Sequence, residues 1–463
     1  MSTHSRRSFL AAAAALFATP VFVGRSAAAD VDVVIVGAGA AGIAAARRVA
    51  AAGRSFRLFE ASDRVGGRCV TDSKLFGVPF DLGAHWIHNP DSNPVLAAGR
   101  SGFDIYPVPR AQSLRVGPRT ARDAELETFL AATLKAQRAL ADLGKAKTDF
   151  PAARLLPKDL GDWQATIEFT SGPLARGKDL KDISALELAR AAERETDAFC
   201  RQGYGTVLAK LAVGLPVQLS TSVDLIYWGG NALSVDTPKG NLLARAVILT
   251  VSPGVLASDT IEFMPTLPKR QSDAAEKLAL GSYDHIAFEL PSNPLGLQRD
   301  DMVFEQSTGP RTAALLANVG GTSLHLVEVA GSFGRELAKN GEPAMIDFAR
   351  EWLVSLFGSN VKSTIKRSYA TNWGADPLAR GAMSAPGLGH AEARKILQEP
   401  LGGRIWFAGE ALHDTQWGTV AGAGDSGTRA AEAALRKMGA LKDSGAGRPA
   451  RRGRRRRGRG GDD

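Results

Sequence analysis

The chain has 463 residues, of which 44% are hydrophobic and 23% are charged. This length predicts two or more domains, and the composition excludes wholesale disorder and a polytopic membrane protein. The formal net charge is +9, but residues 443–463 contribute five positive charges and residues 1–29 contribute three, which leaves residues 30–442 almost neutral. Because a nucleic-acid-binding fold carries its charge on a folded face, we expect no nucleic-acid partner.

The first 29 residues have the pattern of an export signal. Arg6 and Arg7 precede an apolar run over residues 9–23, and small residues follow up to Ala29. The pattern is similar to a twin-arginine signal, so we expect an exported, periplasmic protein. A permanent membrane anchor is the alternative, although the run is short for a span of about 20 residues and is interrupted by a proline. Twin-arginine export carries folded proteins, which suits a chain that binds its cofactor before export.

The next residues predict the first part of a nucleotide-binding fold. Residues 31–36 and 56–59 predict buried strands, and residues 43–52 predict a helix between them. A glycine-rich loop at 37–42 joins the first strand to the helix. Such a loop, opening a helix N-terminus, binds the pyrophosphate of a dinucleotide. We assign to this site Gly37, Gly39, Ala41 and Gly42.

The glycines of this loop have different expected roles. Gly37 permits the tight turn, Gly39 lets the backbone approach the pyrophosphate, and Gly42 lets the helix pack closely on the strand. Glu60 follows the second strand, where a carboxylate accepts hydrogen bonds from ribose hydroxyls. An acidic residue at this position disfavours a ligand with a 2′-phosphate.

The cysteine and histidine patterns predict no metal site. The two cysteines, Cys69 and Cys200, lie in no metal-binding pattern, and in an exported protein they either pair or stay free. His85 and His88 form an HxxH pattern without further ligands close in sequence.

Two further motifs carry a resemblance to a known family. Residues 64–68 are Arg-Val-Gly-Gly-Arg, and residues 80–88 are Phe-Asp-Leu-Gly-Ala-His-Trp-Ile-His. With the dinucleotide loop, they resemble the flavin-containing amine oxidase family. In that family the arginine of the Gly-Gly-Arg run lies beside the FAD pyrophosphate, and the second motif passes the isoalloxazine ring. The resemblance places these residues beside the flavin: Gly67, Arg68, Gly83, Ala84 and Trp86.

The last third of the chain resembles the second FAD motif of this family, at residues 403–410 and 418–427. Residues 405–408 predict a buried strand and residues 422–435 a helix. We expect Glu410 at the ribityl or phosphate end of the cofactor, and the helix N-terminus at the flavin pyrimidine edge, where negative charge accumulates on reduction. This motif adds the candidate site residues Glu410, Thr419 and Val420.

A third match, at residues 203–205, 219–226 and 244–250, contains apolar runs that predict strands. By resemblance, the backbone of Val223 meets the adenine. The expected fold class is α/β, with a Rossmann-like FAD-binding domain assembled from three segments and interleaved with an α+β substrate domain. The expected boundaries are 1–29 for the signal, 30–93, 205–275 and 386–440 for the FAD-binding domain, 94–204 and 276–385 for the substrate domain, and 441–463 for the tail.

The substrate domain has more helical patterns. Apolar residues at helical spacing predict a helix over 125–143, and Ser184 with Glu187 predicts a capping box at the start of another helix. Residues 145–182 are too irregular to assign. The arginine-rich tail cannot bury a core, so we expect it to be disordered, either simply solvated or in weak contact with an anionic surface.

The substrate-binding residues depart from the usual family pattern. Members commonly carry a lysine that holds a water near flavin N5, and His285 stands at the matching position. A neutral imidazole can also hold that water, and the alternative is an ordinary core or surface histidine. Many relatives flank the amine with two aromatic residues, where this chain has Met383 and Thr419.

Three aromatic or imidazole side chains are further candidates. By resemblance, Trp373 lies beside the flavin, Trp417 is a candidate pocket wall, and His88 either senses the amine or bonds to the backbone near the cofactor. Residues 380–384 lack the cysteine by which some relatives attach FAD, so we expect non-covalent FAD.

The resemblance implies oxidation of a small-molecule amine. Hydride passes from the carbon beside the nitrogen to flavin N5, the imine is hydrolysed, and dioxygen or another acceptor takes the electrons, with hydrogen peroxide as the product of dioxygen. The runs at 86–88 and 419–423 are nearest to polyamine oxidases, with monoamine oxidases close by. One alternative is a flavin-dependent dehydrogenase or desaturase of the same fold with a non-amine substrate. The absence of the lysine and of the aromatic pair favours this alternative. A second alternative is a non-catalytic flavoprotein that serves as a binding module. The candidate catalytic residues are His285, His88, Trp373 and Met383.

Overall fold

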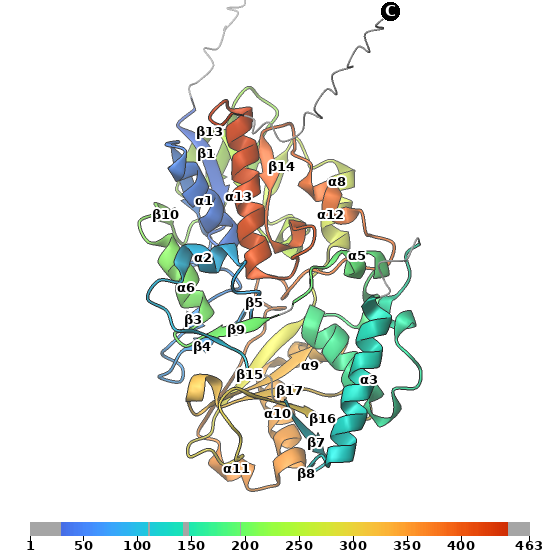
Figure 1. Cartoon of the computed structure of the whole chain (residues 1–463). Coiled ribbons are helices and arrows are strands. Elements are labelled where there is room, and N and C mark those ends of the chain that lie inside the picture. Colours follow the sequence, from blue (N-terminus) through green and yellow to red (C-terminus); the bar gives the residue numbers. More distant parts are fainter. Residues whose placement is uncertain (1–28, 110–111, 142–147, 195, 443–463) are drawn as a thin grey trace, which may run out of the picture.

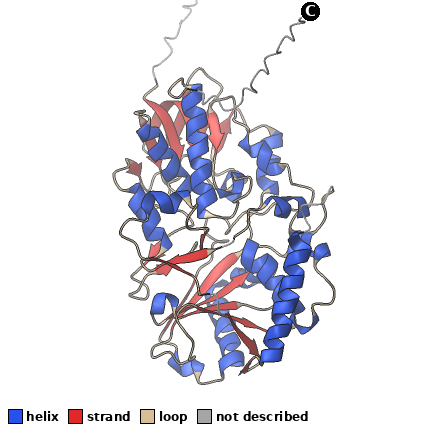
Figure 2. Cartoon of the chain, in the orientation of Figure 1, coloured by secondary structure: helices blue, strands red, loops and turns tan. Residues whose placement is uncertain are grey.

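The computed structural model describes residues 29–109, 112–141, 148–194 and 196–442, which form two lobes, each built on one large sheet (Figure 1, Figure 2). The twin-arginine pattern and the arginine-rich tail lie outside these described residues. Within the described ranges, no helix has the length and apolar character needed to cross a bilayer.

The sheet of the first lobe collects strands from distant parts of the chain, as the predicted fold class requires. β1 (Val31–Val36) pairs in parallel with β2 (Phe56–Phe59) and with β13 (Gly240–Leu249), and β13 pairs in parallel with β20 (Ile405–Phe407). The strands predicted at 31–36 and 56–59 are confirmed. The sheet also contains β10 (Val217–Gln218), β11 (Leu225–Tyr227), β12 (Leu233–Thr237) and β14 (Glu262–Met264).

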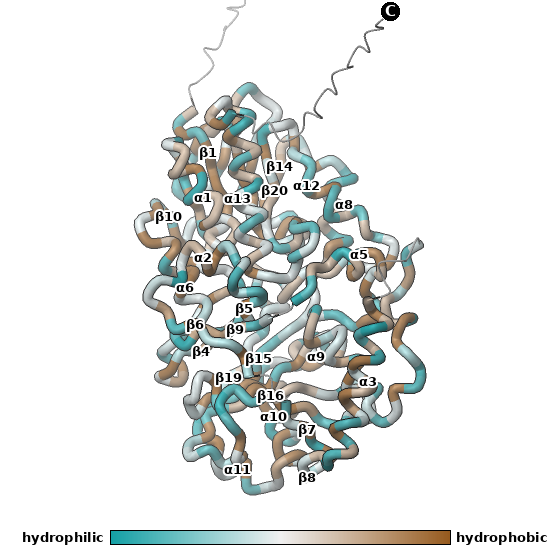
Figure 3. Tube along the Cα trace, in the orientation of Figure 1, coloured by the Kyte–Doolittle hydropathy of each residue, from teal (hydrophilic) through white to brown (hydrophobic). Residues whose placement is uncertain are grey.

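The apolar run of β1, which can be followed in Figure 3, is buried on both faces of this sheet. Val33 and Ile35 pack into a cluster with α1 and α13, whereas Val34 and Val36 pack into a second cluster on the opposite face. This alternation follows from the two-residue period of a strand. The helices that complete this lobe are α1 (Ala40–Ala51), α2 (Pro94–Gly99), α6 (Tyr204–Ala212), α7 (Pro253–Leu256), α8 (Lys269–Lys277), α12 (Ala393–Gln398) and α13 (Val420–Lys437).

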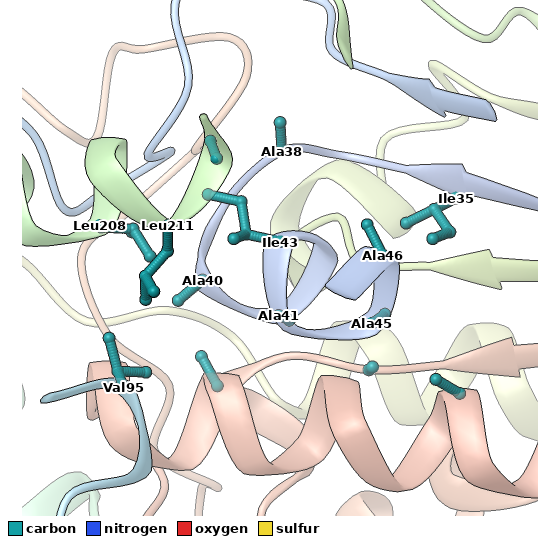
Figure 4. Close-up of a cluster of buried hydrophobic side chains, with 14 of the residues drawn as sticks. Ile35, Ala38, Ala40, Ala41, Ile43, Ala45, Ala46, Val95, Leu208 and Leu211 are labelled. Atoms are coloured by element: carbon teal, nitrogen blue, oxygen red, sulfur yellow. The ribbon is translucent and has the colours of Figure 1, made fainter. Parts of the chain in front are cut away.

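Helices α1 and α13 lie side by side on one face of the sheet (Figure 4). A Cβ atom on Gly427 of α13 would lie only 2.0 Å from the carbonyl oxygen of Ala41 in α1. Both helices begin earlier than predicted, because Gly39 and Thr419 take the N-cap positions. Their small residues therefore permit a close contact between the two glycine-rich parts of the chain.

Three strand predictions need correction. Of residues 219–226, only the last two lie in a strand, because the backbone turns at Ser220, which has a positive φ of 48°. The strand predicted at 405–408 ends at Phe407, and the strand predicted at 244–250 extends from Gly240 to Leu249. The residues at 219–224 instead form a connection that lies along the edge of a cavity described below.

The second lobe is α+β, with a largely antiparallel sheet. β15 (Tyr283–Glu289) lies between β19 (Arg367–Ala370) and β18 (Leu324–Ala330). The sheet continues through β17 (Ala314–Ala317), β16 (Asp301–Glu305), β7 (Gln112–Val116) and β8 (Arg119–Thr120). Its helices are α3 (Asp123–Ala141), α4 (Gln164–Phe169), α5 (Ala185–Arg190), α9 (Gly331–Lys339), α10 (Gly341–Phe357) and α11 (Val361–Thr364).

A small three-stranded sheet connects the lobes: β9 (Asp197–Cys200) pairs with β5 (Ile87–His88) and β6 (Ile105–Pro107). Register places His88 opposite Asp197. A hairpin of β3 (Thr71–Asp72) and β4 (Phe80–Asp81) lies before β5 in the chain. This part of the chain therefore brings the predicted motif at 80–88 between the two large sheets (Figure 1).

The helical predictions in the second lobe are correct in outline. The helix predicted over 125–143 begins at Asp123 and is described to Ala141. Only half of the predicted capping box forms: Ser184 Oγ accepts a hydrogen bond from the Glu187 backbone N–H, while the Glu187 carboxylate binds Arg394 and Arg190 instead. The described part of the unassigned region contains α4 and short helical turns at Ala152–Leu155, Gly161–Trp163, Thr170–Leu174 and Leu180–Asp182.

The two cysteines are both buried and free, so they do not form a disulfide. Among the described residues, no cluster of three histidine, cysteine or acidic side chains is arranged to hold a metal ion.

We predict that the substitution Gly427→Ala lowers stability by roughly 1 to 3 kcal/mol, because the added methyl group forces α1 and α13 apart. Denaturant unfolding measures this change. Gly309→Ala is the control, since a Cβ there meets no atom within 4 Å. Equal unfolding midpoints for the two variants would show that the helix contact tolerates separation.

Candidate functional site

A cavity of about 520 Å³ lies between the two lobes and takes its walls from both. The candidate site residues from the sequence line it, except Gly42 and Trp417. The fold therefore brings together candidate residues that are hundreds of positions apart in the chain. The candidates on the cavity wall are Gly37, Gly39, Ala41, Glu60, Gly67, Arg68, Gly83, Ala84, Trp86, His88, Val223, His285, Trp373, Met383, Glu410, Thr419 and Val420.

Gly42 supports the glycine-rich loop from behind. A Cβ atom at this position would lie 1.8 Å from the carbonyl oxygen of Gly37. Only glycine therefore allows α1 to start directly against the end of β1, which is the packing role predicted for it. The N-terminal turn of α1 is thereby fixed at the cavity wall, where free backbone N–H groups favour an anionic ligand.

Glu60 stands at the end of β2, on the wall of the cavity. Its Oε2 atom accepts a hydrogen bond of 2.6 Å from the backbone N–H of Ala38, and its Oε1 atom accepts one of 2.9 Å from the N–H of Ser62. The carboxylate is thus held in place by the glycine-rich loop. Each oxygen retains capacity for a further donor, such as a sugar hydroxyl.

Glu410 and Arg68 form an ion pair at the cavity wall, with 3.1 Å between Arg68 Nη1 and Glu410 Oε1. Arg68 also donates to the carbonyl oxygen of Ala382. Glu410 further accepts hydrogen bonds from the backbone N–H of Ser384 at 3.1 Å, from its hydroxyl at 2.7 Å, and from Gly418 N–H at 2.7 Å. Its carboxylate therefore joins three other residues, Arg68, Ser384 and Gly418, a role that the sequence did not reveal.

The N-terminus of α13 reaches the cavity as predicted. Thr419 caps the helix, with Oγ1 accepting a hydrogen bond of 2.9 Å from the Gly422 N–H. Thr419, Val420 and Ala423 all lie on the cavity wall. The positive end of the helix dipole is therefore directed at whatever occupies this part of the cavity.

His285 lies on β15 with only 2% of its surface exposed. Its backbone N–H donates to Thr371 Oγ1 at 2.9 Å, and its Nδ1 is 3.0 Å from the carbonyl oxygen of Asp81. A carbonyl oxygen only accepts, so Nδ1 carries the proton. Burial, aided by nearby His85, lowers the pKa of His285 to about 4. The imidazole is neutral at pH 7, and Nε2 carries a lone pair.

Glu328 is the functional candidate that sequence reasoning missed. It lies on β18 opposite His285, with 3.8 Å between Glu328 Oε1 and His285 Nε2. The residue is fully buried, and the side chains of Tyr283 and Trp86 are the hydrogen-bond donors that lie beside its carboxyl group. Burial raises the pKa of Glu328 to about 7. The signal available in the sequence was a single acidic residue within the otherwise nonacidic run of residues 324–330.

His88 is held by a carboxylate rather than by the backbone, which corrects one of the two interpretations made for it. Its Nδ1 lies 2.5 Å from Asp197 Oδ1. Burial, together with the positive charges of Arg194 and Arg176, nevertheless lowers the pKa of His88 to about 4. The side chain is thus neutral near pH 7 and lies where two arginines converge.

The tryptophans occupy different places. Trp373 donates from Nε1 to the carbonyl oxygen of Leu82 at 2.9 Å, and its ring packs so closely on Gly83 that a Cβ there would lie 2.9 Å from Cζ2. Trp86 packs on Phe199, with ring centroids 4.8 Å apart. Trp417 does not line the main cavity but a smaller pocket beside it.

Comparison with known proteins agrees with this arrangement. The sequence model of the family described as "Flavin containing amine oxidoreductase" matches residues 40–435. The chain is 26% identical to Polyamine oxidase 4 of Oryza sativa subsp. japonica, over 89% of this chain and 90% of that protein. It is 28% identical to Polyamine oxidase 2 of Arabidopsis thaliana, over 87% of each. Its fold is similar to that of cyclohexylamine oxidase from Brevibacterium oxydans IH-35A, with a TM-score of 0.74 and 22% identity over 89% of this chain and 100% of that one.

The ionisation of Glu328 predicts a specific dependence of stability on pH. Its pKa in the folded protein, about 7, lies above the ordinary value of 4.5. Between these values the folded state keeps a proton that the unfolded state has lost, so stability falls as pH rises from about 4.5 through about 7. Glu328→Gln mimics the neutral acid and removes this fall, which amounts to roughly 3 kcal/mol at most.

Thermal unfolding of the wild type and Glu328→Gln at pH 5 and pH 8 measures the effect. We expect the variant to gain stability relative to the wild type on going to pH 8. Glu127→Gln, on the exposed side of α3, is the control and should show no such gain. Parallel pH profiles for the wild type and Glu328→Gln would mean that Glu328 is not a buried neutral acid.

Proposed function

The chain belongs to the flavin containing amine oxidoreductase family, and we propose that, as an FAD-dependent oxidoreductase, it oxidises a small-molecule amine at the carbon beside the nitrogen. The observation that carries the proposal is one continuous cavity that joins Glu60, at the end of β2, to the buried imidazole of His285. Bound FAD supplies the hydride acceptor and passes electrons on to dioxygen, with hydrogen peroxide as the product.

The residues present fit FAD. The N-terminus of α1 with Arg68 would hold the pyrophosphate, Glu60 the adenosine ribose, and the N-terminus of α13 the pyrimidine edge. We also propose that FAD is bound non-covalently. Cys69 is on the cavity wall, but burial raises its pKa well above the ordinary value, so its thiol stays protonated and unreactive.

This chain's own residues can favour the neutral amine, which is the form with a lone pair. Deprotonation of an alkylammonium ion with a pKa near 10.4 costs roughly 4 to 5 kcal/mol at pH 7. A cavity that excludes water lowers that cost because it destabilises the charged form. Neutral His285 adds no charge, and its Nε2 lone pair can hold a water or accept a proton. Trp86, Trp373 and Met383 exclude bulk water and orient the substrate.

The non-amine alternative keeps one observation in its favour. Met383 and Thr419 line the cavity where many relatives carry aromatic residues, so the wall lacks the pair that flanks an amine. Reduction of the flavin under anaerobic conditions decides between the two. Bleaching by amines but not by matched alcohols or alkanes is expected, and bleaching only by non-amines would contradict the proposal.

We further propose export to the periplasm, on the basis of Arg6-Arg7 and the apolar run that follows. The arginine-rich tail is proposed to be either solvated or in weak contact with anionic surfaces.

We predict that His285→Gln slows the redox cycle by roughly 10²-fold, because a glutamine amide can hold a water but, unlike imidazole Nε2, does not accept a proton. Stopped-flow absorbance at the flavin band, first without and then with dioxygen, separates flavin reduction from reoxidation. His325→Gln is the matched control, since His325 is also buried but does not line the cavity. Unchanged rates of both half-reactions in His285→Gln would remove this residue from the mechanism.

A further inference from the structure

A small pocket adjoins the main cavity. The two share His88, Arg194 and Thr419 on their walls. The pocket, called here the arginine pocket, is also lined by Arg176 and Trp417. Its open volume is about 20 Å³, enough for one small polar group but not for a chain of methylenes.

Arg194 has an unused hydrogen-bonding face. Its Nη1 donates to the carbonyl oxygen of Ala175 at 3.1 Å, whereas its Nη2 is buried and has no hydrogen-bond partner in the described part of the chain. No carboxylate of the described residues forms an ion pair with it. Asp197 is nearby, but it is engaged by His88. A buried guanidinium donor without an acceptor is costly, so a ligand that supplies one is favoured.

Arg176 is a second cation on the wall of this pocket. It makes no hydrogen bond or ion pair with the residues that the structure describes, and its guanidinium lies over the Trp417 ring, 5.1 Å from the centroid. Burial, together with the charge of Arg194, lowers the pKa of Arg176 to about 9. Both arginines therefore remain charged at pH 7 and act on the same small space.

The third donor is the indole of Trp417. This residue is 1% exposed, and its Nε1 has no hydrogen-bond partner among the described residues. The pocket thus combines two guanidinium groups and an indole N–H, all of which donate and none of which accepts. The acidic residue on its wall, Glu193, belongs to an exposed part of the chain.

We propose that the arginine pocket binds a carboxylate carried by the substrate, so that the amine oxidised is an amino acid or a similar carboxylate-bearing amine. This inference rests on the proposed function. A carboxylate matches the planar fork of a guanidinium and offsets part of the positive charge of the pocket, whereas the distal ammonium of a diamine or polyamine would meet two like charges. The position beside Thr419 and His88 places the carboxylate next to the cavity that holds the reacting carbon.

The experiment compares matched substrates with the FAD-loaded full chain. Phenylalanine and phenethylamine differ by one carboxylate, and putrescine represents a diamine. We expect phenylalanine to reduce the flavin with a kcat/KM roughly 10²-fold or more above that of phenethylamine, and putrescine to be the poorest. Arg194→Met and Arg176→Met should each lower the ratio of kcat/KM for phenylalanine to kcat/KM for phenethylamine about tenfold or more. Arg100→Met, an exposed arginine after α2, is the control.

Benzoate distinguishes a carboxylate on the substrate from a separate bound anion. We expect benzoate to perturb the flavin spectrum, to compete with phenylalanine, and to lose both effects in Arg194→Met. Benzoate that leaves phenylalanine turnover uncompeted, or that stimulates phenethylamine oxidation, would assign the pocket to a free anion and overturn the inference.

Failure of this inference is distinguishable from failure of the proposed function. Equal use of phenethylamine or putrescine, unaffected by Arg194→Met, would overturn the carboxylate inference while amine oxidation stands. If no amine of either class reduces the flavin, the proposed function fails. The carboxylate site is then tested by benzoate binding alone, and the absence of a change in the flavin spectrum on addition of benzoate overturns that site as well.

Discussion

The carboxylate of Glu410 is the contact on which the cavity depends. It pairs with Arg68, which precedes it by 342 positions in the chain, and accepts hydrogen bonds from Ser384 and Gly418. A buried charge is tolerated only when it is paired and hydrogen-bonded, so these four segments must come together for the carboxylate to be stable there. The same contacts hold Arg68 and Glu410 in place on the cavity wall.

The parts of the fold that sequence reasoning predicted are those with strong local signals. The glycine-rich loop, the strands at 31–36 and 56–59 and the acidic Glu60 follow from chain periodicity and from what glycine permits. The irregular region before Ser184 gave no such signal, because short helical turns lack a long apolar period. The run 219–226 was interpreted as a strand, although a left-handed turn at Ser220 interrupts it and only its last two residues are in a strand.

The chemistry of the site was less predictable, because it depends on contacts across strands. His285 could be singled out by resemblance, but its protonated nitrogen is set by the carbonyl oxygen of Asp81 and its charge by complete burial. Glu328 faces it only because β15 and β18 pair in one register. Likewise, nothing local in the sequence shows that Arg176 and Arg194 converge on Trp417. Such features belong to the tertiary structure and appear only after the lobes are assembled.

The discontinuous sheet has a consequence for biosynthesis. β20 and α13 are made last, yet they supply a parallel neighbour for β13 and the helix that packs against α1. A nascent chain that has emerged only as far as α12 therefore lacks one wall of the nucleotide site and exposes the apolar surface that α13 will cover. The complete wall of the nucleotide site therefore forms only after β20 and α13 have been synthesised.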